Sequence, residues 1–258
     1  MKASVCELPS DWTDNPAMIQ ALKDHVKENN TSLLLLPEMP FYRWVAGIGI
    51  PDARTWQNAV ASHDKWISRL EMFDVPVIAG TRPVMENGVC KNVAFVWTRN
   101  AGAQLVHEKY YLPDEEGFWE ASWYARGNGR FDMFETSGMK IGFLICTELW
   151  FTHHAREYAK AGIHLLLCPR ATPAESSETW LAGGRTGAWI SGAFCLSSNF
   201  NGPNTAALDF GGTAWITEPD GGTVIGRTSV KSPFLTLDID LQAAEDAKKT
   251  YPRYVKEA

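Results

Sequence analysis

Three largely apolar runs are the strongest constraint on how this chain can fold. The clearest is SLLLLP at residues 32–37, and KIGFLIC at 140–146 and IHLLLCP at 163–169 have a similar character. A short continuous apolar run that ends in a proline or in a change of pattern is typical of a buried strand. Such strands need structure on each side, which predicts an α/β protein with a sheet core and helices outside.

The rest of the chain alternates between strand and helix patterns. Strands are expected at 2–8, 75–81, 92–98, 103–109, 193–199 and 233–239, with a hairpin over 212–226. Helices are expected at 14–29, 54–73, 149–161, 176–189 and 240–249. The strands between 75 and 109 follow one another without a helix, which argues against a TIM barrel because that fold needs a helix after every strand. No linker or repeat divides the chain, so residues 1–258 are predicted to form a single domain.

Composition limits the classes of partner that this chain is expected to bind. The net charge is −6 and no basic run is present, which argues against nucleic-acid binding. The apolar runs fall short of the about 18 residues needed to span a bilayer, and the N-terminus has no secretion signal. No pair of cysteines has the C-x-x-C spacing of a zinc or redox site. A cytoplasmic protein with free thiols is therefore expected. The cysteines are Cys6, Cys90, Cys146, Cys168 and Cys195.

Reactive side chains stand at the ends of three predicted strands, where a rigid element can fix a catalytic group. They are Glu38, Lys109 and Cys146. Cys146 is followed by TELW, which is expected to begin a helix. The N-terminus of a helix favours a thiolate, and the backbone N–H of Thr147 can face an oxyanion. An inert buried thiol is the alternative, as for Cys168, which a proline follows.

A catalytic thiol needs a base. Glu38 follows four leucines and a proline, so its carboxylate is a candidate base, and a solvated loop glutamate is the alternative. Lys109 ends a strand, where its ammonium either stabilises a developing oxyanion or lies on the surface. A Cys–His pair with His153 or His154 is a further possibility. The two histidines have no second ligand pair at metal spacing, so no metal is expected.

Together, the segments LLLLPEMPF, HEKYYLPDEEGFWE and GFLICTELWF resemble the three signature regions of the nitrilase superfamily of carbon–nitrogen hydrolases, in the family's order. AGIHLLLCPRAT and GGTAWITEPDGGTVIG also look like family segments, so the resemblance covers nearly the whole chain. By motif, it implies Glu38 as general base, Lys109 as oxyanion stabiliser and Cys146 as nucleophile. It also implies a second glutamate just before a Gly–aromatic pair, which Glu116 matches best and Glu115 next.

The resemblance implies a four-layer α-β-β-α sandwich and a homodimer or larger homo-oligomer. The chain departs from the family pattern at Glu7, where the first strand normally ends in glutamine, and after Arg185, where the usual carboxylate is missing. Glu148 is interpreted as a first-turn carboxylate that stabilises its helix, with a role in the site as the alternative.

The activity that the resemblance implies is cleavage of a small amide through a Cys146 thioester, without metal or organic cofactor. A nitrilase or an N-carbamoyl amidohydrolase is the alternative within enzymes, and an inactive binding protein is the alternative outside them. Aromatic residues next to the catalytic segments suit a compact, partly apolar acyl group, and an arginine can bind a substrate carboxylate or form a structural ion pair. The candidate substrate-binding residues are Tyr42, Trp44, Trp119, Trp150 and Arg170.

Overall fold

The strands of the protein form two layers that are joined at one pair of strands. The structure is a computed structural model and describes residues 1–203 and 208–256. The first layer has the spatial order β5 (Gly102–Glu108), β4 (Val89–Thr98), β3 (Val77–Glu86), β2 (Leu33–Leu35), β1 (Lys2–Pro9) and β13 (Phe234–Asp238). The second has the order β6 (Phe134–Thr136), β7 (Met139–Phe143), β8 (Leu165–Pro169), β9 (Phe194–Pro203), β11 (Trp215–Thr217) and β12 (Val224–Arg227). The end of β1 pairs in parallel with β9, which joins the layers, and β10 (Asp209–Gly211) pairs with β9.

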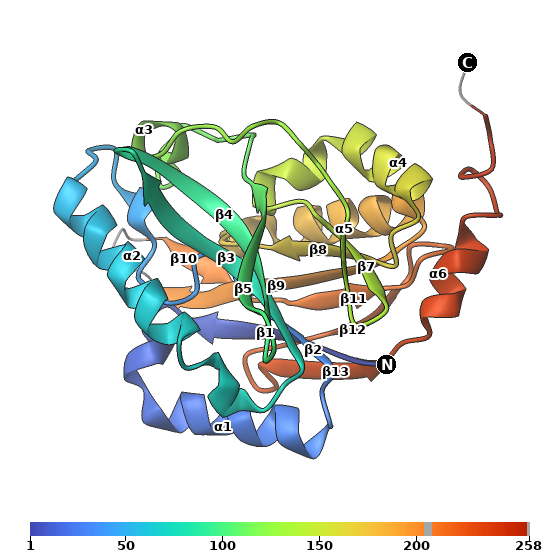
Figure 1. Ribbon diagram of the computed structural model, residues 1–258, viewed down its shortest axis with the longest axis horizontal. Helices are drawn as coiled ribbons and strands as arrows, with labels where there is room; N and C mark the ends of the chain where they lie inside the picture. The colour runs from blue at the N-terminus through green and yellow to red at the C-terminus, as the bar shows by residue number, and fades with distance from the viewer. Residues whose placement is uncertain (204–207, 257–258) are drawn as a thin grey trace.

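Helices cover the outer face of each strand layer, as Figure 1 shows. α1 (Pro16–Glu28) and α2 (Ala53–Ile67) pack on the first layer, and α4 (Thr152–Ala161) and α5 (Ser177–Ser191) pack on the second. Two shorter helices, α3 (Glu120–Trp123) and α6 (Leu241–Ala247), complete the set in the described residues. The predicted α-β-β-α arrangement is therefore confirmed.

The leucine run of β2 explains why that strand is uniformly apolar. Leu33 and Leu35 point into the core between the two strand layers, whereas Leu34 and Leu36 point into the core beneath α1 and α2. Successive side chains of a strand face opposite sides, so a strand with apolar packing on both sides needs an unbroken apolar run. β8 is built in the same way, with Leu165 and Leu167 facing one core and Leu166 and Cys168 facing the other.

Local structure after the nucleophile strand differs from the prediction. Cys146–Trp150 forms a 3₁₀ turn, and the α-helix begins only at Thr152. The predicted helix 54–73 likewise ends at Ile67 and is followed by a 3₁₀ turn at Leu70–Phe73. β6, β10 and α3 are absent from the prediction, since elements of three or four residues carry too short a pattern to be recognised. In the part of the chain that the structure describes, no helix combines the length and apolar character needed to cross a bilayer.

Candidate active site

The side chains of Glu38, Lys109 and Cys146 come together at the ends of β2, β5 and β7. All three are buried, and Lys109 Nζ donates to Glu38 Oε1 at 2.7 Å. The Cys146 sulfur is close enough that a thiolate there would raise the pKa of Lys109. β2, β5 and β7 are not neighbours, but they run in the same direction, so their carboxyl ends lie on the same side of the strand layers and supply one cluster.

A second glutamate completes this cluster, and it is Glu120 rather than the predicted Glu116. Lys109 Nζ lies 2.5 Å from Glu120 Oε2, and the Tyr124 hydroxyl donates to that same oxygen. Glu116 is exposed, because the chain turns back at 115–118, where Phe118 N donates to Glu115 O at 2.8 Å. Glu115 and Glu116 thus lie at the tip of a turn, whereas Glu120, the first residue of α3, points inward to Lys109.

The buried ammonium of Lys109 and the buried carboxylates of Glu38 and Glu120 stabilise one another's charges. Burial by itself lowers the pKa of Lys109, but the carboxylates of Glu120 and Glu38 raise it above its ordinary value, so the ammonium stays charged. Burial and the nearby Glu38 charge raise the pKa of Glu120 to about 7, against the opposing effect of Lys109. Glu120 can therefore change its protonation state near neutral pH.

Two carboxylate oxygens in the cluster have no hydrogen-bond partner among the described residues. They are Glu38 Oε2 and Glu120 Oε1, whereas Glu38 Oε1 also accepts from Asn92 Nδ2 at 2.7 Å. Unpaired buried carboxylate oxygens cost free energy unless a ligand or water pairs with them. Each is suited to accept a proton or a hydrogen bond from a bound molecule.

Cys146 lies in a strained turn and is uncharged at rest. Its φ is +48°, a left-handed backbone conformation that residues other than glycine rarely adopt. Burial raises the pKa of the thiol and the charge of Glu38 adds to this, whereas Lys109 opposes it. The expectation that a helix N-terminus favours the thiolate is wrong, because the α-helix begins six residues later at Thr152. The thiol therefore needs a base to become nucleophilic.

Cys146 and Glu120 line a pocket of about 230 Å³. Its walls are mostly apolar or small and include the aromatic residues Phe118 and Trp180. Thr147 also lines the pocket, next to the thiol, where we predicted an oxyanion-binding N–H. Besides Cys146 and Glu120, the lining residues are Pro113, Glu115, Phe118, Thr147, Ala171, Thr172, Pro173, Ser176 and Trp180.

Comparison with protein families decides what kind of fold carries this cluster. A family model for carbon-nitrogen hydrolases matches residues 2–249. The chain belongs to this family. The predicted resemblance to the nitrilase superfamily is therefore confirmed.

Relatives of this carbon-nitrogen hydrolase chain have several different names. It is 23% identical over 182 residues to a citrullinase of Francisella tularensis and 25% identical over 162 residues to an N-carbamoylputrescine amidase of Arabidopsis thaliana. These alignments cover 68% and 57% of this chain but only 63% and 54% of the two relatives. A Staphylococcus aureus protein named as a hydrolase in the agr operon is 23% identical over 98% of this chain and 96% of its own length.

Solved structures share the carbon-nitrogen hydrolase fold over almost the whole chain. A carbon-nitrogen hydrolase from Helicobacter pylori has a TM-score of 0.84 at 21% identity, and the match covers 98% of this chain and 94% of that one. A mutant amidase from Nesterenkonia sp. AN1 has a TM-score of 0.78 at 18% identity and covers 95% of this chain and 92% of its own. That structure shows the acetamide moiety of fluoroacetamide added to the active-site cysteine.

None of the predicted substrate-binding residues lines the pocket of this carbon-nitrogen hydrolase. Tyr42 lines a separate groove of about 810 Å³. Trp44 is buried and donates through Nε1 to Gly117 O at 3.0 Å, and Trp119 packs on the core beneath α1 and α2. These aromatic residues lie close to the catalytic segments in sequence, but they pack on the core beneath α1 and α2 and do not line the pocket.

Trp150 and Arg170 contact residues that line the pocket instead of lining it themselves. The Trp150 ring lies 5.1 Å from the ring of Trp180. The Arg170 guanidinium is buried and donates to Thr172 Oγ1 at 2.5 Å and to Ser197 Oγ at 2.7 Å. Each guanidinium nitrogen of Arg170 has a partner inside the protein and the residue does not line the pocket, so the structure does not place it to bind a substrate carboxylate as predicted. Trp180 was missed because it lies in the helix after β8, distant in sequence from every signature segment.

In the described residues, no group of three or more histidine, cysteine, aspartate or glutamate side chains is placed to hold a metal ion. The two adjacent histidines instead pack against aromatic rings. His154 stacks on Phe131 with ring centroids 3.4 Å apart and contacts the Tyr111 hydroxyl at 3.0 Å. Burial lowers the pKa of His154 to about 4, and this residue does not line the pocket that contains Cys146.

Proposed function

We propose that this chain hydrolyses a carbon–nitrogen bond of a small linear amide, with Cys146 as nucleophile, and releases ammonia or an amine and a carboxylic acid. The observation that carries the proposal is the buried contact of Lys109 with Glu38 and Glu120, beside a thiol that lines a pocket. This set combines a nucleophile, a base and a fixed cation, which acyl transfer through a thioester requires.

In the acylation step, the unpartnered oxygen of Glu38 accepts the Cys146 proton when substrate binds. The sulfur bonds to the carbonyl carbon, and the negative charge that forms on the carbonyl oxygen is stabilised by Lys109 Nζ and by the Thr147 N–H. The C–N bond then breaks, and Glu38 gives its proton to the departing nitrogen. An acyl thioester remains on Cys146.

In the deacylation step, water attacks the thioester carbon and a carboxylate accepts its proton. Glu120, whose pKa is raised to about 7, shares this role with Glu38. The C–S bond breaks, the proton returns to the Cys146 sulfur and the carboxylic acid leaves. Lys109 keeps its positive charge in both steps, so it can stabilise the oxyanion in each of them.

The size and lining of the pocket support a small acyl group. A volume of about 230 Å³ lies below the roughly 300–1,000 Å³ of sites for drug-sized ligands. The Trp180 and Phe118 rings form apolar walls, and no arginine or lysine is among the lining residues of the described chain. We therefore expect an acyl group without a negative charge.

An N-carbamoyl amidohydrolase is the second candidate function. Relatives named citrullinase and N-carbamoylputrescine amidase favour it. The same residues would act on the carbamoyl carbon, and carbon dioxide would then accompany ammonia. Turnover of a nitrile would instead identify a nitrilase, and the absence of any turnover would favour an inactive binding protein.

The test is release of ammonia from small amides, matched nitriles and N-carbamoyl compounds by wild type and Cys146→Ala, with carbon dioxide measured in parallel. We expect ammonia from amides, and none from the variant. Carbon dioxide together with ammonia from carbamoyl compounds alone would replace the amide with the second candidate. No turnover of any compound in this panel by folded wild-type protein would overturn the proposal in favour of a binding protein.

A further inference from the structure

Glu148, two residues after the nucleophile, connects the segments that carry Lys109 and Cys146. Its side chain is completely buried. One carboxylate oxygen accepts from Tyr110 N at 2.7 Å, and the other accepts from Ile145 N at 2.8 Å. The two donors directly follow Lys109 and directly precede Cys146. A single carboxylate therefore sets the spacing between the cation and the thiol.

His107 neutralises this carboxylate from the strand that ends in Lys109. Its Nε2 lies 2.7 Å from Glu148 Oε2, and its Nδ1 lies 3.1 Å from the backbone oxygen of Arg130. Both partners are acceptors, so both ring nitrogens donate only when the ring is a protonated imidazolium. Burial by itself lowers the pKa of His107, but Glu148 raises it above its ordinary value. The pair is therefore a buried ion pair.

The turn that holds Cys146 needs such a constraint. A non-glycine residue at φ +48° costs free energy and persists only where the surroundings fix it. The Glu148 carboxylate closes this turn by accepting from Ile145 N, on the other side of Cys146. Loss of the carboxylate's charge or position would let the turn relax and move the sulfur away from Glu38 and Lys109.

We propose that the buried His107–Glu148 ion pair is a positioning element that fixes the nucleophile turn relative to Lys109, and that hydrolysis requires it intact. The inference rests on the proposed function and deepens it. Neither residue lines the pocket that contains Cys146, so both act through the backbone of the turn. Removing one partner would leave the other as an uncompensated buried charge.

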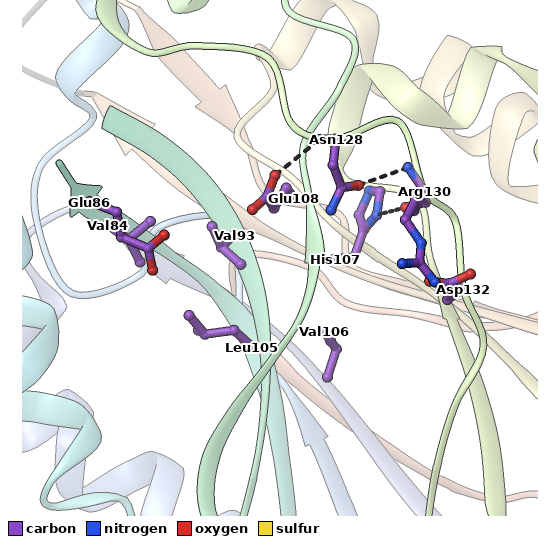
Figure 2. Close-up of a pocket in the computed structure, with 10 residues that line it drawn as sticks. All are labelled: Val84, Glu86, Val93, Leu105, Val106, His107, Glu108, Asn128, Arg130 and Asp132. Carbon is purple, nitrogen blue, oxygen red and sulfur yellow. Dashed lines mark hydrogen bonds and ion pairs between the residues drawn. The ribbon is translucent and has the colours of Figure 1, made fainter. Parts of the chain in front are cut away.

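A second pocket, of about 150 Å³, gives His107 a route for proton exchange. Figure 2 shows His107 at its wall, facing the backbone of Arg130. The charged or titratable groups that face the imidazole are Glu148 from the nucleophile turn, His154 from α4, Glu108 from β5, and the exposed Arg130–Asp132 pair. Glu148 is the one that contacts a ring nitrogen, so it sets the charge state of His107.

The main test compares His107→Gln with His164→Gln. His164 is a matched control, because its Nε2 also lies 2.7 Å from a carboxylate, that of Glu245, and it directly precedes β8, whose other end leads to the pocket. We expect His107→Gln to lower kcat by about 10- to 100-fold with KM changed by about twofold at most, which is the effect of misplacing a reacting group rather than of losing substrate contacts. His164→Gln is expected to keep wild-type kcat.

The pH profile provides a readout that a merely structural role would not change. The pKa of His107 is raised, so the imidazolium is present below that pKa and is lost as the pH rises through it. Wild type should therefore lose activity on the alkaline side, and His107→Gln should lack that decline. An identical decline in both proteins would overturn the inference.

Glu148→Gln and the double variant test whether the two residues act as one unit. Each single variant should lower kcat, and the double variant should be no less active than the less active single variant. Additive losses would overturn the pairing. If His107→Gln does not fold, Glu148→Gln with wild-type kcat would overturn it equally.

Alkylation of Cys146 by iodoacetamide separates this inference from the proposed function, because it needs no amide substrate. We expect alkylation at pH 7 to be about tenfold slower in His107→Gln than in wild type and in His164→Gln. Equal rates in the three proteins would contradict the positioning role even if wild type hydrolysed no amide at all. Wild type that is alkylated faster than His107→Gln but hydrolyses no compound of the panel would instead count against the proposed function alone.

Discussion

At the scale of single residues, Lys109 organises the site. Its buried ammonium contacts Glu38 at 2.7 Å and Glu120 at 2.5 Å, so two negative charges share one positive charge. Burial, together with the nearby charge of Glu38, raises the pKa of Glu120 to about 7 even beside a cation. The cluster can thus hold or release one proton near neutral pH while the ammonium stays fixed.

The first prediction distinguishes the two glutamates that follow the lysine. Glu120→Gln removes a charge that contacts Lys109 and should lower kcat by about 100-fold or more, the usual effect of losing a general acid–base group. Glu116→Gln, at the exposed tip of the turn, should keep wild-type kcat. Steady-state kinetics of the two variants check this. A large loss in Glu116→Gln with an active Glu120→Gln would reverse the assignment.

The second prediction concerns the hydroxyl of Tyr124, which donates to Glu120 and thereby lowers its pKa. Tyr124→Phe removes this donor, so the pKa of Glu120 should rise further above about 7. If ionised Glu120 is needed, activity falls as the pH drops through that pKa, and the acid side of the variant's pH profile should move to higher pH. An unmoved acid limb would show that Glu120 is not the group that titrates.

At the scale of elements, α5 combines a structural and a functional role. Its glycines face the second strand layer, and a Cβ at Gly184 would lie 2.5 Å from Trp215 Nε1. Only a residue without a Cβ lets the helix approach that closely. Trp180, in the first turn of the helix, lines the pocket. The fit of α5 on the strands therefore places one wall of the candidate active site.

The third prediction tests that close approach. Gly184→Ala overpacks the contact with Trp215 and should lower the free energy of unfolding by about 1–3 kcal/mol. Thr186→Ala, on the exposed face of the same helix, should change it by no more than about 0.5 kcal/mol. Denaturant unfolding measures both. Equal stabilities of the two variants would mean that α5 shifts freely on the strand layer.

At the scale of the whole molecule, the outer surface near α5 carries unusual aromatic exposure. Trp189 is 39% exposed, and its ring lies 6.2 Å from that of Tyr251, which is 63% exposed. Neighbouring exposed aromatic rings on a chain with a well-formed core are a candidate contact surface. The predicted homodimer or larger homo-oligomer provides one way to cover them, and it stays a prediction.

The fourth prediction follows from that surface. Light scattering of wild type should give a mass of two or more chains, because burial of apolar surface drives association. Trp189→Glu should shift the protein toward the monomer, whereas Val230→Glu, at a position that is 83% exposed and distant in sequence from α5, should not. A monomeric wild type at micromolar concentrations would contradict the prediction.

Much of the fold was predictable because the sequence patterns that indicate its strands and helices lie within a few consecutive residues. The leucines of β2 and β8 encode burial on two faces within a handful of residues. The short elements escaped prediction for the same reason, since α3 has only four residues. The 3₁₀ turn at Cys146–Trp150 has the sequence pattern of a helix start, because both conformations suit the same residues over one turn.

By itself, the sequence indicated the layered α/β architecture through its apolar runs, and it singled out Glu38, Lys109 and Cys146 because the segments that hold them resemble family motifs, which are read along the chain. Only the tertiary structure decided that Glu120 contacts Lys109 and that Trp180 lines the pocket. The same holds for the pairing of His107 with Glu148, which are 41 residues apart. These contacts depend on how distant segments pack, and no local pattern records which side chain turns inward where two segments meet.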